Sequence, residues 1–394
     1  MTTALEDLAM IGDGETVALL SSHGTVEWLC LPRFDSPACC AALLGNRQHG
    51  HWTIEPRGAV RKTEQRYRSD TLVLETEITT DGGTMRIVDF MPIRDRNPTF
   101  VRILEGVSGK LTVDLTAAFR FDYGNMPPWT EHRDGLLVFH VGPDKLVLTG
   151  IDEPELNDGT VTAALKLEKG IRYVFTLAYG AAHETVPVIP DPDKALRETE
   201  KYWRDWIGHF DKPVPYEKEI RRSLLVLKAL IHRPTGGLVA AATTSLPEKS
   251  GGDMNWDYRY CWLRDAAFTV RSLVECGFME EANAWRDWML RAVAGSEEKL
   301  KIMYRVDGSR RLDEAELDWL PGYRFARPVR VGNAAAGQFQ LDVYGEVIHM
   351  LHVSKQAGME RTEQGELLEQ QIIAELEHSW SKPDHGIWED RGQP

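Results

Sequence analysis

Val186-Pro-Val-Ile-Pro-Asp-Pro192 divides the chain into two unlike parts. Proline has no backbone N–H and restricts the residue before it, so three prolines within seven residues predict a linker. Before this stretch, apolar and polar residues alternate as in strands; after it, apolar residues recur at helical spacing. We therefore predict a multidomain chain, β then α, with a β-sandwich domain over residues 1–185, a linker with a helix over 186–215 and a helical domain over 216–394.

Strand patterns fill the first part. Within Thr71–Thr80, leucine and isoleucine side chains fall on one face and two glutamates on the other, a period of two residues. Gly82-Gly83 predicts a turn, after which Met85–Phe90 resumes the alternation. No long helical pattern interrupts these segments, so we predict an antiparallel sandwich. The other expected strands are Phe100–Leu104, Lys110–Phe121, Leu136–Val141, Lys145–Leu148, Val161–Leu167 and Tyr173–Tyr179.

Helical patterns fill the second part, and long loops rich in polar and aromatic residues separate some of them. Helices joined by such loops fit an α/α toroid whose loops build a site at one end, and they also fit a simple bundle. Asp193 is a candidate N-cap of the first helix. The expected helices are Asp193–Phe210, Tyr216–His232, Arg264–Cys276, Glu280–Ala294, Ala334–Gln356 and Thr362–Ser379.

Composition narrows the classes of partner. The 394 residues carry a net charge of −14, which argues against nucleic acid or an anionic membrane, since both attract clustered lysine and arginine. Five cysteines without CxxC spacing fit reduced thiols in a cytoplasmic protein and give no zinc motif. The N-terminus lacks a basic signal segment, and no run of about eighteen apolar residues predicts a membrane span. We therefore expect a cytoplasmic protein with neither a metal nor a cofactor. A small neutral substrate such as a sugar is compatible with the charge, which does not select it.

The most informative stretch is Asn255-Trp-Asp-Tyr-Arg-Tyr-Cys-Trp-Leu-Arg-Asp265. If it is extended, its four alternating aromatic residues, among them Tyr258 and Trp262, fall on one side. Arg264 and Asp265 follow at the start of an expected helix. Sugars pack their C–H faces on aromatic rings and take paired hydrogen bonds from guanidinium and carboxylate groups, so this combination predicts a sugar site. A buried strand with an aromatic core and an Arg–Asp helix cap fits the stretch equally well.

A second candidate stretch runs from Trp319 to Asn333 and continues into an expected helix as far as Glu346. It combines three arginines, aromatic residues and an amide immediately before that helix. Phosphate binding at the helix N-terminus is one interpretation, although no GxxxxGK pattern supports a nucleotide site. A loop held by arginine–carbonyl hydrogen bonds is the structural alternative.

The third stretch is Pro383-Asp-His-Gly-Ile-Trp-Glu-Asp390. A carboxylate beside a tryptophan suits a general acid, because the ring lowers the local polarity and raises the carboxyl pKa, so that the group keeps its proton near neutrality. By itself, Glu389 also fits an ordinary surface carboxylate. His349 and His352 share one face of an expected helix, but no third ligand accompanies them, so they indicate a partly buried face rather than a metal site.

These three stretches, in this order, resemble glycoside hydrolase family 15, which includes glucoamylases, glucodextranases and bacterial trehalases. The segment Ile11–Pro37 looks like the opening of the bacterial trehalase-like branch. Gly236–Glu248 and Tyr258–Asp265 are similar to its barrel entry, and Arg327–Asn333 and Gly386–Glu389 continue the match. The resemblance covers essentially the whole chain.

The resemblance implies a β-supersandwich followed by an (α/α)6 barrel, and inverting hydrolysis of α-glucosidic bonds. The implied enzyme is an α,α-trehalase that splits trehalose to glucose, with a glucoamylase- or glucodextranase-like exo-α-glucosidase as the alternative. Glu389 matches the general acid that protonates the leaving oxygen. Arg264 and Asp265 would hold hydroxyls of the reacting glucose, and Phe325 and Arg327 lie where the family shapes neighbouring subsites. The full set of implied substrate-binding residues is Tyr258, Trp262, Arg264, Asp265, Phe325, Arg327 and Trp388.

The resemblance also implies that the general base of the reaction is missing. An inverting mechanism needs a second carboxylate roughly 6.5–9.5 Å from the acid to activate water, and in the family that base lies well downstream. We therefore expect a chain truncated at its C-terminus, with a partial barrel, no general base and apolar helix faces that favour self-association. A truncated, inactive or purely carbohydrate-binding protein is the alternative. His385 and Asp390 also depart from the branch's usual residues, and both stand close enough to alter the pKa of the acid.

Overall fold

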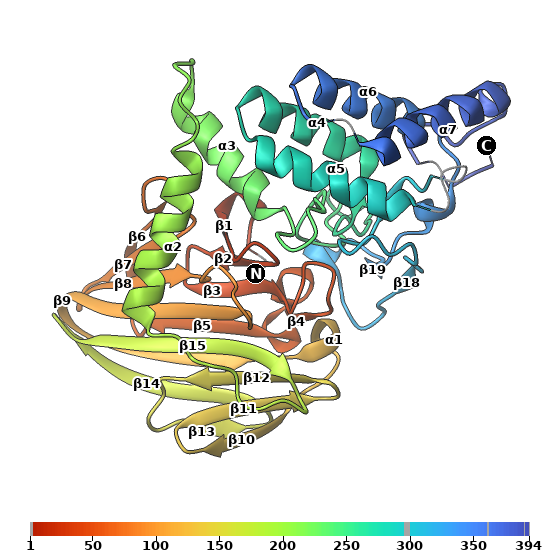
Figure 1. The fold of residues 1–394 in the computed structure, drawn as a ribbon. Helices are drawn as coiled ribbons and strands as arrows, with labels where there is room; N and C mark the ends of the chain where they lie inside the picture. The colour runs from red at the N-terminus through yellow and green to blue at the C-terminus, as the bar shows by residue number, and fades with distance from the viewer. Residues whose placement is uncertain (1–2, 295–299, 361, 390, 394) are drawn as a thin grey trace. The chain divides into compact units, whose positions relative to one another are not determined.

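The computed structural model describes residues 3–294, 300–360, 362–389 and 391–393, and the chain divides into two compact units (Figure 1). The first unit comprises Met1–Gly208 together with Asp318–Arg327, and the second comprises His209–Leu317 together with Pro328–Pro394. The division after Gly208 lies within the 186–215 stretch. The short segment Asp318–Arg327 belongs to the first unit although it follows that division by more than a hundred residues.

The first unit is built from antiparallel strands in two layers that share one long strand, β9 (Thr99–Ala118) (Figure 1). One layer contains β1 (Leu8–Gly12), β2 (Val17–Ser21), β3 (Thr25–Cys30), β4 (Ala38–Cys40), β5 (His51–Pro56), β13 (Glu155–Asn157) and β14 (Thr160–Glu168). The other contains β6 (Val60–Tyr67), β7 (Leu74–Thr80), β8 (Gly83–Phe90), β10 (Trp129–Arg133), β11 (Leu136–Val141), β12 (Asp144–Thr149) and β15 (Arg172–Ala181).

Strand β9 passes from one layer to the other. Its first part pairs with β8 and β15, and its second part pairs with β5 and β14. The passage depends on glycine: Gly109 has φ +69°, and a Cβ there would lie 2.1 Å from the Gly82 carbonyl oxygen. The prediction of two separate strands, Phe100–Leu104 and Lys110–Phe121, is therefore wrong. The glycines between them permit close backbone contact instead of ending the strand.

Aromatic rings fill the space between the layers. Trp52 packs edge to face against Phe100 with ring centroids 5.4 Å apart, and Phe119 packs in the same way against Phe139 at 5.1 Å. All four side chains are buried in one hydrophobic cluster that also collects leucine, isoleucine and valine from both layers. Such pairs add about 0.5–1.5 kcal/mol each to the stabilisation from buried area.

A charged pair crosses this core. Arg102 on β9 donates from Nε to Asp89 Oδ1 at 2.7 Å, and both side chains are fully buried. The remaining guanidinium donors reach the carbonyl oxygens of Trp52 and Gly24, each at 2.8 Å. The Arg102 guanidinium therefore links β8 and β9 to the backbone of the other layer. Its hydrogen bonds also satisfy donors that burial would otherwise leave unpaired.

Helix α2 (Pro192–Ile207) covers a second, smaller apolar cluster of the first unit (Figure 1). Ala195 of the helix joins valine, isoleucine and phenylalanine side chains from β8 and β9 there. Asp191 caps the helix, since its side chain accepts a hydrogen bond from the Lys194 N–H at 2.7 Å. The prediction that Asp193 is the N-cap is therefore wrong. Pro192 occupies the first helical position and fixes the cap one residue before it.

The second unit contains the helices α3 (Glu217–Ala229), α4 (Leu263–Glu275), α5 (Met279–Val293), α6 (Asp342–Gln356) and α7 (Glu363–Ser379) (Figure 1). Helix α4 packs against α5 and α6, and α7 packs against α6 and α5. The predicted helix Ala334–Gln356 is wrong at its start: a 3-10 turn covers Ala334–Gly337, and α6 begins only at Asp342. Short strand pairs lie in the loops, namely β16 (Cys261–Trp262) with β17 (Met303–Tyr304) and β18 (Ala315–Glu316) with β19 (Arg330–Val331).

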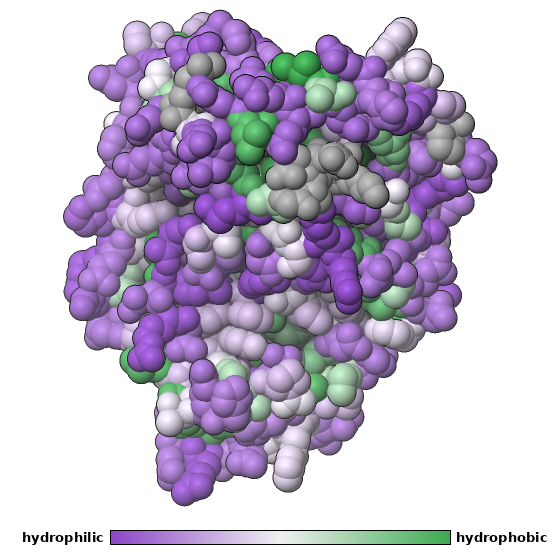
Figure 2. All heavy atoms as spheres, turned by 45° about the vertical axis from the view of Figure 1, so that its right-hand side comes forward, coloured by the Kyte–Doolittle hydropathy of each residue, from purple (hydrophilic) through white to green (hydrophobic). Residues whose placement is uncertain are grey.

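Several large apolar side chains of the helical unit are exposed, including Phe268 on α4 and Leu367 and Ile373 on α7. Figure 2 shows a mainly hydrophilic face on which apolar side chains gather in patches. Among the described residues, no helix combines the length and the apolar character needed to cross a membrane.

Candidate active site

The site begins at the junction between a short strand and a helix. Trp262 ends β16, where it is buried, and α4 begins at the next residue. Arg264 and Asp265 therefore lie in the first turn of α4, directly after the aromatic residue. A negative carboxylate at this position also interacts favourably with the positive end of the helix dipole.

Glu389 meets this junction from a turn near the end of the chain. Its Oε1 accepts a hydrogen bond from Trp262 Nε1 at 2.8 Å and a longer one from Arg264 Nη2 at 3.4 Å. Arg264 also donates from Nη1 to the Ile387 carbonyl oxygen at 3.0 Å and from Nη2 to Asp265 Oδ2 at 3.3 Å. The fold thus brings together residues more than 120 positions apart in the sequence.

Burial is the main influence on the pKa of the Glu389 carboxyl group. Loss of water contact raises the pKa of Glu389 above its usual value, and the neighbouring negative charge of Asp265 adds to the rise. The hydrogen bond from Trp262 and the positive charge of Arg264 oppose it without cancelling it. The carboxyl group therefore keeps its proton to higher pH than a surface glutamate does, as a general acid requires.

Two tyrosines extend the aromatic surface around Trp262. The Tyr258 ring centroid lies 5.4 Å from that of Trp262, and the Tyr260 centroid lies 6.4 Å away. Burial and the nearby Glu389 raise the pKa of the Tyr258 hydroxyl, so it stays a hydrogen-bond donor. The stretch forms a strand only at its end, however, and Trp256 packs differently, beneath the guanidinium groups of Arg330 and Arg391.

A buried ion pair holds the stretch in this shape. Arg259 donates from Nη2 to Asp257 Oδ2 at 2.7 Å, and both side chains are almost fully buried. Asp257 also accepts from the Gly332 N–H at 3.1 Å and from the Tyr260 hydroxyl at 3.1 Å. These contacts join the first and second candidate stretches, which favours a structural role for Asp257 and Arg259.

The remaining predicted residues are distributed between the two units. Phe325 and Arg327 belong to the first unit, where Arg327 donates to the Asp318 carbonyl oxygen at 3.3 Å. Phe325 is largely exposed and, with Arg324, lines a hollow of the first unit. Trp388 is 85% exposed, so its ring is open to solvent beside the acid. The structure therefore gathers Tyr258, Trp262, Arg264, Asp265 and Glu389 into one cluster of the second unit.

Sequence reasoning missed three polar residues around this cluster. Gln338 donates from Nε2 to the Glu389 carbonyl oxygen at 3.3 Å, and Asp384 accepts from the Leu341 N–H at 3.0 Å, just before α6. Asp342 has both carboxylate oxygens buried without a hydrogen-bond partner among the described residues, and burial raises its pKa. In the turn after α7, the Gly386 N–H donates to the Asp384 side chain. The spacing Asp384-x-Gly386 is typical of such a turn and could have marked Asp384 in the sequence.

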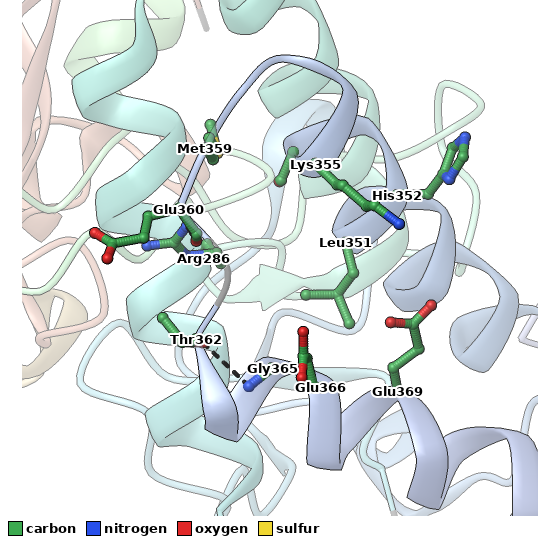
Figure 3. Close-up of a pocket in the computed structure, with 11 residues that line it drawn as sticks. Arg286, Leu351, His352, Lys355, Met359, Glu360, Thr362, Gly365, Glu366 and Glu369 are labelled. Atoms are coloured by element: carbon green, nitrogen blue, oxygen red, sulfur yellow. Dashed lines mark hydrogen bonds between the residues drawn. The ribbon is translucent and has the colours of Figure 1, made fainter.

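Another hollow of the second unit lies between α6 and α7, with Arg286 contributed by α5 (Figure 3). Lysine, arginine and glutamate side chains surround it, but no Trp, Tyr or Phe occurs among the described residues that line it. It therefore lacks the aromatic surface on which a sugar packs. Within the described ranges, no group of three or more histidine, cysteine or acidic residues is arranged to hold a metal ion.

Comparisons with known proteins identify the family of this chain. The family model described as glycosyl hydrolases family 15 matches residues 215–394, and a trehalase-like N-terminal model matches residues 1–203. A protein named trehalase from Thermoplasma acidophilum is 33% identical over 385 residues, which cover 95% of this chain and 65% of that protein. Trehalases from Thermoplasma volcanium and Mycobacterium tuberculosis are 31% and 32% identical over 98% and 99% of this chain. The chain spans 62% of the length of each of these two.

A solved structure supports the fold. A bacterial glucoamylase complexed with acarbose matches 96% of this chain and 67% of its own length, with a TM-score of 0.58 and 9% sequence identity. The predicted fold class, an antiparallel β domain followed by helices of the (α/α)6 barrel type, is confirmed. The chain therefore shares its architecture, a β domain followed by a helical domain, with this glucoamylase. The chain belongs to glycoside hydrolase family 15 and has a trehalase-like N-terminal region.

Proposed function

We propose that the cluster around Glu389 takes part in the inverting hydrolysis of an α-glucosidic bond, with trehalose as the substrate. The observation that carries the proposal is the partly buried Glu389 carboxyl group, which lies 2.8 Å from the Trp262 indole nitrogen and has a raised pKa. A carboxyl that keeps its proton near neutrality is the group that protonates a leaving glycosidic oxygen. The trehalase names of relatives that match nearly the whole chain favour trehalose over other glucosides.

The reaction assigns one task to each residue. The C–O bond of the glucoside breaks, and its oxygen takes the proton of Glu389, while water adds to the anomeric carbon from the opposite face and gives up a proton to a base. Arg264 and Asp265 hydrogen-bond hydroxyls of the reacting glucose. Tyr258 and Trp262 supply the ring surface for its C–H face. We assign no base within residues 1–394.

Incubation of the full chain with trehalose, followed by proton NMR, tests this proposal. Inversion at one anomeric carbon of trehalose gives equal initial amounts of β-glucose and α-glucose, because the leaving sugar keeps its configuration. Glu389→Gln should abolish release, and the control Glu377→Gln, on the exposed side of α7, should not. Release that is unchanged in Glu389→Gln would refute the role of this residue.

Two alternatives give different results in the same assay. Release of glucose from maltose or isomaltose, but not from trehalose, would identify a glucoamylase- or glucodextranase-like specificity. Calorimetric binding of trehalose without any release would identify a carbohydrate-binding chain that lacks the base. Loss of that binding in Trp262→Phe or Asp265→Asn would then locate the bound sugar in the same cluster.

We further propose a cytoplasmic location and self-association. The five cysteines are free thiols, which suits a reducing compartment. Leu290 on α5 and Leu367 on α7 line a partly apolar hollow of the helical unit. Phe268 on α4 and Ile373 on α7 are also exposed. Cell fractionation and analytical ultracentrifugation test the two statements separately. A monomer at micromolar concentration would contradict the second.

A further inference from the structure

We propose that Arg391 is a positioning residue for Glu389, and that it acts through a stack on Trp256 and an ion pair with Glu314. The inference rests on the proposed function only for the role of Glu389 as the acid. Its physical basis is how the chain after α7 is held, within the second unit.

The turn that carries Glu389 does little to hold the residue itself. Glu389 has φ +56°, a left-handed conformation that a non-glycine residue adopts at a cost of about 1 kcal/mol or more. Its own N–H reaches the Gly386 carbonyl oxygen only at 3.5 Å. No helix or strand contains the turn. The position of Glu389 therefore depends on the hydrogen bonds from Trp262 and Gln338 and on contacts made by the chain on either side of it.

The segment before the acid is anchored at three points. The His385 N–H donates to the Phe339 carbonyl oxygen at 3.0 Å, and Asp384 accepts a hydrogen bond from the Leu341 N–H. Arg264 donates to the Ile387 carbonyl oxygen at 3.0 Å. These contacts fix the chain up to two residues before Glu389. On its other side, Gln338 donates to the Glu389 carbonyl oxygen at 3.3 Å, and the remaining support comes from the residues that follow.

Arg391 supplies the anchor that follows. Its guanidinium carbon lies 4.1 Å from the ring centroid of Trp256, and its Nη2 lies 2.9 Å from Glu314 Oε2. The guanidinium of Arg330 also lies over Trp256, at 4.5 Å, with Nε 3.7 Å from Glu314 Oε1. Trp256 and Glu314 thus each contact both arginines, and the negative charge of Glu314 offsets the repulsion between the two guanidinium groups.

The position of this anchor gives it a catalytic consequence. Arg391 stands two residues from Glu389, and two residues of chain reach at most about 7 Å. A shift of the anchor therefore moves the acid. Displacement of a catalytic group by about 1 Å can lower a rate by about 100-fold. A planar guanidinium can stack on indole and pair with a carboxylate at once, whereas the compact ammonium of lysine pairs without stacking flat.

The pH titration of the Trp262 indole signal tests the inference without any turnover. Trp262 Nε1–H donates to Glu389, so its proton–nitrogen NMR signal, assigned with Trp262→Phe, reports the charge of that carboxyl. In the wild-type chain the midpoint should lie above the usual glutamate value of 4.5. In Arg391→Ala it should fall toward that value with a smaller amplitude, because the carboxyl leaves its buried place. Arg264, Asp265 and Tyr258, which face Glu389, are unchanged in this variant.

Arg391→Lys should lie between the wild-type chain and Arg391→Ala. The control Arg271→Ala removes an arginine–carboxylate pair of 2.8 Å on α4 and should leave the titration unchanged. Where hydrolysis is measurable, Arg391→Ala should lower kcat by about 100-fold with little change in KM. A wild-type titration in Arg391→Ala would overturn the inference.

Two further variants decide the case if Arg391→Ala does not fold. Trp256→Phe keeps an aromatic ring for stacking and should retain the wild-type midpoint, whereas Trp256→Leu should lower it. Identical midpoints in these two variants would refute the stack as the anchor. Absence of glucose release from the wild-type chain would count against the proposed function alone, since the titration requires no hydrolysis.

Discussion

Two arginine–carboxylate pairs, one in each unit, are built in different ways. Arg102 and Asp89 in the sheets are fully buried and 2.7 Å apart, and the other guanidinium donors reach backbone carbonyls of the facing layer. Arg264 and Glu389 in the helical unit are 3.4 Å apart and are 23% and 15% exposed. The first pair is close and well satisfied, whereas the second is long and shared with Trp262.

The difference separates a structural pair from a reactive one. A short, fully bonded pair favours a single arrangement of the strands around it, although burial also raises the pKa of Asp89. The longer contact leaves the Glu389 side chain partly exposed, so its carboxyl can exchange a proton, whereas the Asp89 carboxyl is enclosed. Weak pairing is therefore a requirement of the proposed site rather than a defect in its packing.

The largest expected effect follows from breaking the buried pair. Arg102→Met leaves the charge of Asp89 without a partner inside the sheets and should lower the free energy of unfolding by about 3–5 kcal/mol. Urea denaturation followed by circular dichroism measures the loss. Lys110→Met is the control, because its ion pair with Glu168 is exposed on both sides and its removal should change little. A loss no larger than that of the control would contradict the structural role of Arg102.

A smaller loss is expected when the reactive pair is broken. Arg264→Met removes a long contact that solvent partly screens and a hydrogen bond to the Ile387 carbonyl oxygen, so about 1–2 kcal/mol should be lost in the same denaturation experiment. The pKa of Glu389 should rise further, since Arg264 holds it down. A destabilisation equal to that of Arg102→Met would remove the distinction between the two pairs.

The smallest effect is a gain of stability that depends on pH. The folded pKa of Glu389 lies above the unfolded value of about 4.5, so the stability contributed by its protonated form is present below that value and is lost as pH rises through the folded pKa. Glutamine does not titrate. Glu389→Gln should therefore gain stability relative to the wild-type chain as pH rises through the folded pKa, and the gap should level off above it.

Thermal melts of both proteins between pH 4 and pH 8 measure this gap. The exposed control Glu377→Gln should show a difference from the wild-type chain that hardly varies with pH. A pH-independent gap for Glu389→Gln would mean that the acid is solvated in the folded chain.

Local patterns predicted the elements that local forces determine. Alternation over Thr71–Thr80 and Met85–Phe90 corresponds to β7 and β8, and the expected bounds of α4 and α5 are within one residue of the observed ones. The continuous β9 and the membership of Asp318–Arg327 in the first unit depend on contacts far along the chain. A window of a few residues contains no information on such contacts.

The candidate site was likewise predictable only in part from local sequence. Residue chemistry alone marked Trp262, Arg264 and Asp265 as a possible sugar site, but it left Glu389 as an ordinary carboxylate. Only the family resemblance connected the acid to a stretch more than 120 residues before it. The anchor at Arg391 escaped notice because its partners, Trp256 and Glu314, lie in two distant stretches of the sequence. The departure noted at Asp390 lies outside the described residues.

The segment Asp318–Arg327 limits how this chain can be recombined with its relatives. The Tyr323 hydroxyl donates to the Thr3 carbonyl oxygen at 3.1 Å, and Trp319 Nε1 donates to the Tyr123 carbonyl oxygen at 3.2 Å, both within the first unit. The polypeptide therefore passes between units after Gly208, after Leu317 and after Arg327. A chimera joined once, in the linker, would combine the sheets of one parent with this segment from the other. Exchange of whole units requires all three junctions, so neither unit can be replaced as one continuous segment.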